Sequence, residues 1–501
     1  MQVLTRVLRD NVEEFGEYPF LYDGDLVYSN AESLRQSERI RDLLVAAGIQ
    51  PGDRVLVSMP NRAEVFFVYQ GAMMAGAVVV PVMYLLGRPE IAHIMRDAEP
   101  AGVFIDDSSL DKVLGASEDA GLAPRIWSAD PSDRVAWLWE RGDYPAAAPP
   151  ELREQDLAVI LYTSGTTGAP KGVMLTHKNL YANAQQVIAS SPDRDRGVTL
   201  GVLPLAHIFG FTVSTVTAML GSSIVIFRKF DVRQVFEAIQ RYRVRGFSAV
   251  PAMLYAMVQS PEADRFDLSS LETVSSGSAP CPVPLIEAFQ AKFHAEVLEG
   301  YGLSEAAPVV SGHRRNMPIK PGTVGVLVSG VEARIVDFEG RELPVGHVGE
   351  LWVRGDNVSP GYFRRPEATR QVLDADGWLH TGDVACLDED GYLTIVDRKK
   401  DVIIRGGFNI YPRDVEEVLM RHPAIAEAAV VGVPSERLGE EAVAFVTAKP
   451  GAVIDEEEVL GYGRQVLAHY KVPKALRVVD ALPRNAVGKV MKRTLKEWAS
   501  R

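Results

Sequence analysis

Residues 157–172 read LAVILYTSGTTGAPKG, and this stretch decides the kind of fold to expect. An apolar strand, LAVILY, leads into a loop that carries four hydroxyl side chains and two glycines between Thr163 and Lys171. The backbone N–H groups of such a loop can surround phosphate oxygens while the lysine neutralises their charge. The loop is not a Walker phosphate loop, because the G-x-x-x-x-G-K-[ST] spacing fails. Taken alone, the segment also fits a solvated Ser/Thr/Gly turn.

Length and composition are those of a multidomain globular protein. The chain has 501 residues, enough for roughly three folding units if a domain takes about 150 residues. Apolar residues make up 47% of the chain and charged residues 24%, which is typical of proteins with several hydrophobic cores. The net charge of -13 disfavours nonspecific binding of nucleic acid. We therefore expect any bound nucleotide to be a small molecule.

The charge pattern of residues 1–20 and the spacing of the cysteines favour the cytoplasm. Residues 1–20 scatter charges along their length and hold no apolar core, which argues against a secretory signal. The apolar residues 71–86 are too short to span a membrane and are broken by Pro81, so we expect a buried helix that runs into a core strand. Cys281 and Cys386 show no C-x-x-C or zinc-ligand spacing, which favours a reducing compartment and a packing role.

The hydrophobic pattern predicts an α/β fold with helices packed on mixed sheets. Short β-branched runs at residues 222–227, 332–337 and 350–355 are typical of strands. Residues 231–242 predict a helix with one apolar face and with Asp231 as its N-terminal cap. Alternation of such strands and helices favours layered packing of helices on sheets.

The pattern of residue types changes at the charged run DRKKD, residues 397–401, where we place a domain boundary. Before it, glycines between residues 322 and 337 indicate a β-rich subdomain that belongs to no single sheet. After it, residues 403–412 read as a strand and residues 414–423 as an amphipathic helix closed by Pro423. Two further strands would complete a small α+β domain.

Four more segments carry side chains suited to a nucleotide: SGSAP (276–280), EGYGLSE (299–305), WLHTGD (378–383) and PRNAVGK (483–489). Small residues in the first allow backbone to approach a flat base. The aromatic ring and the carboxylate in the second suit a base and a hard cation. The ionised carboxylate in the third only accepts hydrogen bonds and so suits a diol. Singly, each segment also fits an ordinary turn, a buried tyrosine or a surface lysine.

Together and in this order, the five segments resemble the superfamily of adenylate-forming enzymes, which includes acyl-CoA synthetases, adenylation domains of peptide synthetases and beetle luciferases. The resemblance runs over nearly the whole chain. It implies an N-terminal AMP-binding domain over residues 1–397, built of several subdomains with mixed sheets and a β-rich part. It also implies a small, mobile α+β C-terminal domain over residues 398–501.

The resemblance assigns most motif residues to ATP. The first loop would hold the β- and γ-phosphates, the second would lie along adenine, and Tyr301 would stack on the base. Ser304 would bond the α-phosphate, Glu305 would hold Mg²⁺, and Asp383 and Arg398 would bind the ribose. The complete ATP set is Thr163, Ser164, Gly165, Thr166, Thr167, Gly168, Lys171, Gly277, Ser278, Ala279, Gly300, Tyr301, Gly302, Ser304, Asp383, Arg398 and Lys489.

Three residues are expected to act in catalysis, namely Lys489, Thr166 and Glu305. By resemblance, Lys489 enters the active site when the acid attacks the α-phosphate of ATP. The two reactants repel each other because both are anionic, and a cation that bridges them relieves this repulsion as charge develops.

The remaining candidates serve the acid, the acceptor and the domain movement. His207 resembles a residue that lines the acyl pocket, and a packed histidine is the alternative. Lys400 matches the hinge about which the C-terminal domain would rotate, whereas a solvated charge run is the alternative for its segment. The candidates for CoA binding are Tyr470, Lys474, Gly406 and Gly407.

We therefore predict an AMP-forming acyl-CoA synthetase that uses ATP, Mg²⁺ and CoA. A serine hydrolase or a dinucleotide oxidoreductase is disfavoured because neither G-x-S-x-G nor G-x-G-x-x-G occurs. The expected acid is a medium- or long-chain fatty acid or a similar hydrophobic acid, as in fatty acid metabolism. Loading of a carrier-protein phosphopantetheine and activation of an aromatic or polycyclic acid stay open, as does the choice between monomer and homodimer.

Overall fold

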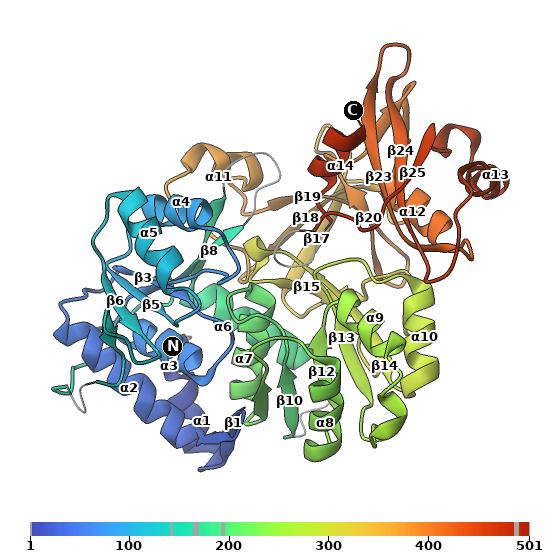
Figure 1. Cartoon of the computed structure of the whole chain (residues 1–501). Helices are drawn as coiled ribbons and strands as arrows, with labels where there is room; N and C mark the ends of the chain where they lie inside the picture. The colour runs from blue at the N-terminus through green and yellow to red at the C-terminus, as the bar shows by residue number, and fades with distance from the viewer. Residues whose placement is uncertain (1–2, 141–143, 164–169, 192–195, 485–489, 500–501) are drawn as a thin grey trace.

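The computed structural model describes residues 3–140, 144–163, 170–191, 196–484 and 490–499. Within these ranges the strands form five sheets, with helices packed against them (Figure 1). This arrangement confirms the expected α/β fold. No described helix is long and apolar enough to cross a membrane.

A seven-stranded sheet lies in the N-terminal part and is parallel except for the pair β8–β9. Alternate residues of β3 face opposite sides, with Val55 and Val57 packed toward α2 and α3 and Leu56 packed toward α4 and α5. Strands covered on both faces read as continuous apolar runs. In spatial order the strands are β7 (Ala136–Trp137), β6 (Arg125–Ser128), β5 (Gly102–Ile105), β3 (Arg54–Ser58), β4 (Val78–Pro81), β8 (Leu157–Thr163) and β9 (Lys171–Thr176).

The predicted buried helix and core strand of residues 71–86 are confirmed as the end of α3 and as β4. The helices that flank this sheet are α2 (Asn30–Ala46), α3 (Ala63–Met74), α4 (Arg88–Ala98) and α5 (Leu110–Ala120).

Two further sheets extend the N-terminal part. One is ordered β10-β11-β1-β2, and the other is ordered β12-β13-β14-β15-β16. Their strands are β1 (Pro19–Asp23), β2 (Leu26–Ser29), β10 (Val198–Gly201), β11 (Ser223–Ile226), β12 (Gly246–Ala249), β13 (Thr273–Ser276), β14 (Glu296–Gly302), β15 (Val309–Gly312) and β16 (Val326–Leu327). The helices around them are α1 (Val7–Phe15), α6 (His177–Ser190), α7 (Ile208–Met219), α8 (Val232–Tyr242), α9 (Pro251–Gln259) and α10 (Val283–Phe293).

Helix α8 begins where the sequence predicts. The carboxylate of Asp231 accepts a hydrogen bond from the backbone N–H of Gln234 at 2.9 Å, which satisfies one of the free donors in the first turn. Val235, Phe236 and Ile239 form its buried face. Local capping and a 3.6-residue apolar period therefore suffice to fix this helix.

An antiparallel sheet of β17 (Val331–Val336), β18 (Gly349–Gly355), β19 (Leu379–Leu387) and β20 (Leu393–Arg398) follows, with α11 (Pro366–Val372) between β18 and β19. The glycine-rich run 322–337 is indeed divided between two sheets, because β16 belongs to the preceding one. Gly325 has a φ of 74°, and a Cβ there would lie 2.0 Å from the carbonyl carbon of Gly312. Only glycine fits at this crossing between the sheets.

The C-terminal sheet is ordered β22-β21-β24-β23, with β25 paired to β24. Its elements are β21 (Ile403–Arg405), β22 (Phe408–Ile410), α12 (Pro412–Met420), β23 (Ile425–Ser435), β24 (Gly439–Ala448), α13 (Glu456–Val466), β25 (Ala475–Val478) and α14 (Lys492–Ala499). The two expected tail strands are confirmed as β23 and β24. Residues 403–412 differ from the single strand predicted, because they form a hairpin that turns at Gly406 and Gly407, whose φ values are 58° and 86°.

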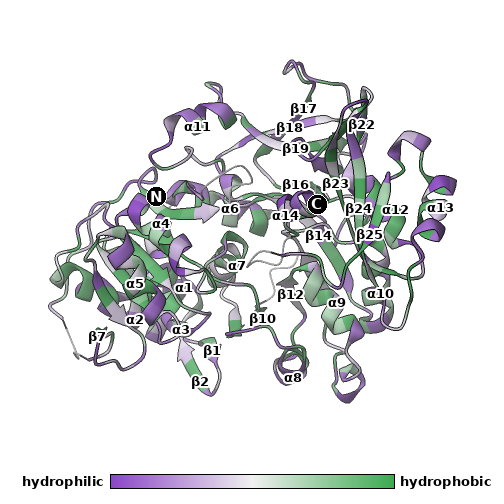
Figure 2. Cartoon of the chain, turned by 45° about the horizontal axis from the view of Figure 1, so that its top comes forward, coloured by the Kyte–Doolittle hydropathy of each residue, from purple (hydrophilic) through white to green (hydrophobic). Residues whose placement is uncertain are grey.

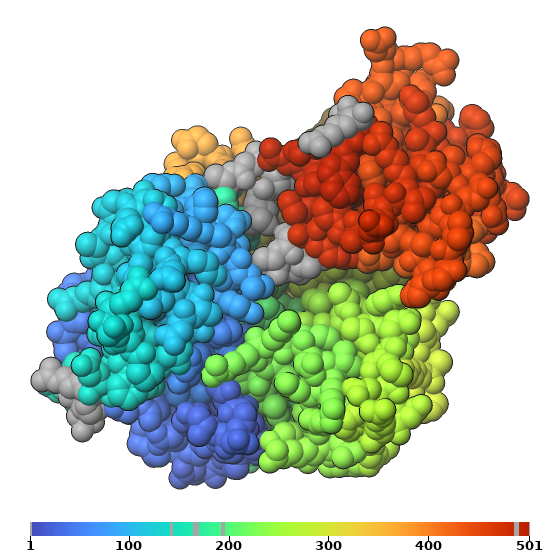
Figure 3. All heavy atoms as spheres, viewed as in Figure 1, coloured from blue at the N-terminus to red at the C-terminus, as the bar shows by residue number. Residues whose placement is uncertain are grey.

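The C-terminal sheet stands as a separate mass over the N-terminal part (Figures 1 and 3). Among the described residues, no strand joins the sheets on the two sides of residues 398–403. Hydrophobic residues concentrate in the central strands, whereas α11 and α13 at the periphery are largely hydrophilic (Figure 2). The residues considered below lie where these two parts meet or at nearby strand ends.

Candidate functional site

The predicted phosphate loop connects the antiparallel strands β8 and β9. Thr163 and Lys171 are paired across these strands and mark the two described ends of the loop. At its base the Tyr162 hydroxyl donates to Asp97 on α4 at 2.7 Å. The other loop residues expected to bind phosphate lie outside the described residues; they are Ser164, Gly165, Thr166, Thr167 and Gly168.

The segment expected to lie along adenine follows β13 directly. Gly277 is buried, and a Cβ added to it would lie 3.3 Å from the ring of Phe209 and 3.6 Å from the carbonyl oxygen of Gly300. Ser278 has a φ of 68°, so the chain turns sharply before Ala279. The structure thus brings the SGSAP loop beside the Gly300–Gly302 end of β14, as a shared base-binding surface requires.

A buried carboxylate lies directly under that β14 end. The Glu299 side chain is only 5% exposed, and its Oε2 has no hydrogen-bond partner. Burial raises the pKa of Glu299 to about 7, although the positive charge of Arg413 in the C-terminal part opposes this rise. The sequence motif contains Glu299 but gave it no role, because its burial is a property of the folded chain.

Three predicted nucleotide residues meet in one hydrogen-bonded group. Asp383 is buried, and its carboxylate accepts from the Tyr301 hydroxyl at 2.5 Å and lies 3.1 Å from Nε of Arg398. Asp383 and Arg398 are paired residues on the neighbouring strands β19 and β20, whereas Tyr301 comes from β14. Burial and the adjacent Asp383 carboxylate raise the pKa of Tyr301 well above its usual value, so its hydroxyl stays protonated.

Replacing Asp383 by asparagine should weaken ATP binding by about tenfold to a hundredfold, the range expected for losing charged hydrogen bonds. The expected cause is loss of the ionised acceptor for the ribose diol, together with the partner of Tyr301 and Arg398. Calorimetric titration with ATP measures the effect. Asp388→Asn is the matched control, because this carboxylate lies at the far end of the same hairpin and pairs with Lys320 at 2.7 Å. Equal affinities for Asp383→Asn and the parent would contradict a ribose-binding role.

The expected Mg²⁺ ligand, Glu305, follows Ser304 in a short 3₁₀ turn, Ser304–Ala306. The described residues contain no cluster of three or more His, Cys, Asp or Glu that could hold a metal ion. One carboxylate is still a suitable partner for Mg²⁺, which keeps several waters and binds mainly through substrate phosphates. Glu305 therefore fits an ion that arrives with ATP rather than one held by the protein alone.

A residue that the sequence reasoning did not select lies against this carboxylate. The Tyr362 hydroxyl donates to Oε1 of Glu305 at 2.7 Å, and Nζ of Lys171 lies 5.2 Å from the centre of the Tyr362 ring. Tyr362 is separated from both residues by long stretches of chain. The GYFRRPEAT segment in which it lies has no pattern that predicts this contact, which only the fold shows.

His207 caps helix α7. Its Nδ1 accepts a hydrogen bond from the backbone N–H of Phe209 at 3.2 Å. The ring therefore has a structural role at the start of the helix. Contact between His207 and the carboxylate of an acid remains a prediction.

Lys400 is exposed and lies in a turn between the two parts of the molecule. The backbone N–H groups of Asp401 and Val402 donate to the carbonyl oxygen of Arg398 at 2.8 and 3.1 Å. The predicted hinge residue, Lys400, thus lies two residues after Arg398, the partner of Asp383. Lys489 lies outside the described residues.

The four CoA candidates lie on neighbouring segments of the C-terminal sheet. Gly406 and Gly407 form the exposed hairpin turn, and Tyr470 stacks on Phe408 of that hairpin with ring centres 4.9 Å apart. Lys474, on the approach to β25, is paired with Glu441 through a 2.6 Å contact. The sequence predicts that the positive charge of Lys474 binds CoA, whereas in this arrangement the Glu441 carboxylate neutralises that charge.

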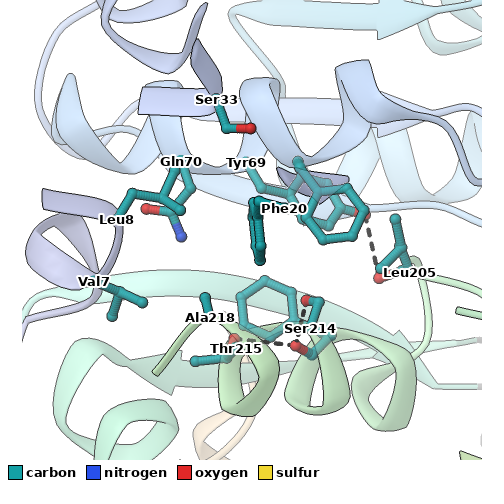
Figure 4. A pocket seen from close by; sticks show the side chains of 12 residues that line it. Val7, Leu8, Phe20, Ser33, Tyr69, Gln70, Leu205, Ser214, Thr215 and Ala218 are labelled. Atoms are coloured by element: carbon teal, nitrogen blue, oxygen red, sulfur yellow. Dashed lines mark hydrogen bonds between the residues drawn. The ribbon is translucent and has the colours of Figure 1, made fainter. Parts of the chain in front are cut away.

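Two cavities elsewhere hold none of the predicted site residues. A small cavity of about 30 Å³ lies between α1, α3 and α7, where the Tyr69 hydroxyl donates to the Leu205 carbonyl oxygen at 3.4 Å (Figure 4). It has room for only one or two water molecules, which could satisfy the unpartnered Oε1 of Gln70. A larger surface groove of about 520 Å³ lies between α1, α6 and α7.

Comparison with known proteins shows relatives along nearly the whole chain. A family model described as AMP-binding enzyme matches residues 8–363, and one described as AMP-binding enzyme C-terminal domain matches residues 414–489. A long-chain-fatty-acid–CoA ligase of Bacillus subtilis (strain 168) is 36% identical over 99% of this chain and 94% of its own. The 4-coumarate–CoA ligase 2 of Nicotiana tabacum is 35% identical over 97% of this chain and 92% of its own.

Solved structures also match over the full length. ATP-bound MatB from Rhodopseudomonas palustris has a TM-score of 0.91 at 34% identity, with 99% of this chain and 98% of that chain covered. The apo form of the same protein has a TM-score of 0.81. By this measure the chain is more similar to the ATP-bound structure than to the apo structure.

Proposed function

This chain belongs to the AMP-binding enzyme family, and we propose that it activates a hydrophobic carboxylic acid as acyl-AMP and transfers the acyl group to CoA. It is an AMP-forming acid–thiol ligase that uses ATP, Mg²⁺ and CoA. The proposal concerns the acid, a medium- or long-chain fatty acid, and the residues that act on it. The observation that carries the residue assignments is the hydrogen-bonded group in which the buried Asp383 carboxylate meets Tyr301 and Arg398.

Two half-reactions make up the proposed cycle. In the first, a carboxylate oxygen of the acid attacks the α-phosphorus of ATP, and pyrophosphate leaves. Lys171 and Lys489 are assigned to the negative charge on the phosphates and on the attacking acid. In the second, the CoA thiolate attacks the acyl carbonyl carbon, and AMP leaves with the electron pair of the broken bond. Adenylate leaves far more readily than the hydroxide of a free acid, which is why the acid is first activated.

A rotation of the C-terminal part about Lys400 is proposed to separate the two half-reactions. In the arrangement seen here the Gly406–Gly407 turn is exposed on the C-terminal sheet. Rotation would bring this turn toward the nucleotide site, where two glycines allow the pantetheine arm to pass close to the backbone. One cavity could then serve both chemistries.

The identity of the acid is best tested by pyrophosphate exchange. We expect exchange with saturated acids of medium and long chain length and weaker exchange with 4-coumarate at equal concentration. Both acid classes appear among the names of the relatives, so the ratio of kcat/KM values decides between them. A preference for 4-coumarate or a polycyclic acid would replace the fatty acid proposal without affecting the ligase activity.

The acceptor is tested by offering preformed enzyme-bound acyl-AMP either CoA or a panel of phosphopantetheinylated carrier proteins. CoA is expected to be the efficient acceptor. Thioester formation on a carrier protein but not on CoA would favour the alternative of a carrier-loading enzyme.

Replacing Lys474 by alanine should raise the KM for CoA by roughly tenfold, because a charge-assisted contact to the anionic nucleotide end of CoA would be lost. Pyrophosphate exchange should not change, since uniform binding of the acceptor does not touch the adenylation step. Lys471→Ala is the matched control, because Lys471 instead pairs with Asp414 on α12 at 2.7 Å. A parallel substitution of Tyr470 should act in the same direction as Lys474→Ala. Unchanged CoA kinetics in both would place CoA elsewhere.

A further inference from the structure

Tyr362 joins two parts of the nucleotide site that are far apart in sequence. Its half-buried side chain hydrogen-bonds to Oε1 of Glu305 at 2.7 Å. Tyr362 is the donor and the Glu305 carboxylate the acceptor in this contact.

The backbone on both sides of Tyr362 is hydrogen-bonded to strand β9. The carbonyl oxygen of Gly361 accepts from Met174 on β9 at 2.9 Å, and the N–H of Phe363 donates to Gly172 at 2.8 Å. A few residues earlier, the N–H of Ser359 donates to the backbone carbonyl oxygen of Glu305 at 2.8 Å. The segment 359–363 thus connects the base of the phosphate loop to the turn that carries Glu305.

The Tyr362 ring has a second contact on its face. Nζ of Lys171, the last residue of the phosphate loop motif, lies 5.2 Å from the ring centre, within the range of a cation–π interaction. One side chain therefore contacts both the expected metal ligand and the expected phosphate-binding lysine.

We propose that Tyr362 is a positioning residue that orients the Glu305 carboxylate toward Mg²⁺ bound to ATP and supports Lys171 at the phosphates. The proposal rests on the function proposed above, because Glu305 and Lys171 have these ligands only in that function. A carboxylate has two oxygens, and when Tyr362 holds one of them the other is directed to the ion. Partners that hydrogen-bond to metal ligands in this way commonly contribute tenfold to a hundredfold in metal affinity.

The test separates metal-dependent from metal-independent binding of ATP. Calorimetric titrations without acid measure the affinity for ATP in excess Mg²⁺ and for ATP in EDTA. Tyr362→Phe removes the hydroxyl and keeps the ring, so it should weaken MgATP binding by about tenfold or more while metal-free ATP binding stays unchanged. Tyr362→Leu also removes the cation–π contact and should in addition weaken metal-free ATP by about fivefold.

Two further variants sharpen the result. Tyr18→Phe is the matched control, because its half-buried hydroxyl donates to the carbonyl oxygen of Ser222 far from the nucleotide residues. It should bind both forms of ATP as the parent does. Combining Tyr362→Phe with Glu305→Gln should cost no more MgATP affinity than Glu305→Gln alone, since the hydroxyl acts through that carboxylate.

The outcomes distinguish this proposal from the proposed function. If the parent binds MgATP and Tyr362→Phe binds it equally well, the positioning role is wrong and the ligase function stands. If Tyr362→Phe weakens the binding of MgATP and of metal-free ATP equally, the hydroxyl stabilises the site without acting through the metal. That result would also overturn the proposed positioning of Glu305. A parent that fails to bind MgATP would overturn the proposed function itself.

Discussion

Alanine at position 489 should slow acyl-AMP formation by roughly a hundredfold to a thousandfold, the usual cost of removing one donor from a charged transition state. By resemblance, the motif PRNAVGK is expected to form a loop that would bring the ammonium group of Lys489 to the acid and the α-phosphate. That cation is needed while the two anionic reactants approach each other. Thioester formation from supplied acyl-AMP has no such repulsion to overcome and should keep most of its rate.

Both half-reactions must be measured for Lys489→Ala. Pyrophosphate exchange reports the first, and single-turnover transfer from acyl-AMP to CoA reports the second. Arg493→Ala is a suitable control, because it removes an exposed cation from the neighbouring helix α14, where Arg493 pairs with Glu497 four residues on. An equal loss in both half-reactions would refute the assigned role.

Proline at position 400 should slow thioester formation by about a hundredfold while leaving adenylation near the parent rate. Proline fixes φ near -65° and so prevents the backbone rotation that a hinge needs. If the rotated arrangement is reached only with an error of about 1 Å at the thiol, a hundredfold loss is expected. The present arrangement should persist, because the turn is held by hydrogen bonds from Asp401 and Val402 to Arg398, and none of these uses the N–H of Lys400.

The control for this experiment is Lys400→Ala, which removes the side chain and leaves φ free. It should retain both half-reactions if the backbone is the hinge. Pyrophosphate exchange that falls in step with the overall rate in Lys400→Pro would count against a hinge at this position.

Local signals explain what the sequence predicted well. Asp231 caps α8 three residues before the N–H it binds, and the apolar period of that helix repeats within the same segment, so no distant contact is needed. The sequence predicts a single strand where residues 403–410 form a hairpin, because the hairpin strands have three residues each, too few for a clear alternation. Its Gly406–Gly407 pair was the available turn signal.

Distant contacts explain what the sequence missed. Resemblance to the adenylate-forming enzymes named Tyr301, Asp383 and Arg398, but their meeting depends on the register of β19 with β20 and on the position of β14. Tyr362 lies 57 residues from Glu305, and Lys474 lies just before β25 whereas its partner Glu441 lies on β24. Such pairings have no periodic pattern to reveal them, so they become visible only in the folded chain.

The separation of the sheets at residues 398–403 has a consequence for how this chain melts. Among the described residues, the hydrophobic clusters of the C-terminal sheet contain only residues 403–499, whereas the other clusters contain only residues 4–395. Each part is therefore stabilised by the burial of its own apolar side chains. Few apolar contacts join the two parts, so the unfolding of one is only weakly coupled to the unfolding of the other. The two-state approximation does not hold for such a chain. A single transition midpoint would average two events, and ATP would raise the midpoint of the N-terminal event more than the other.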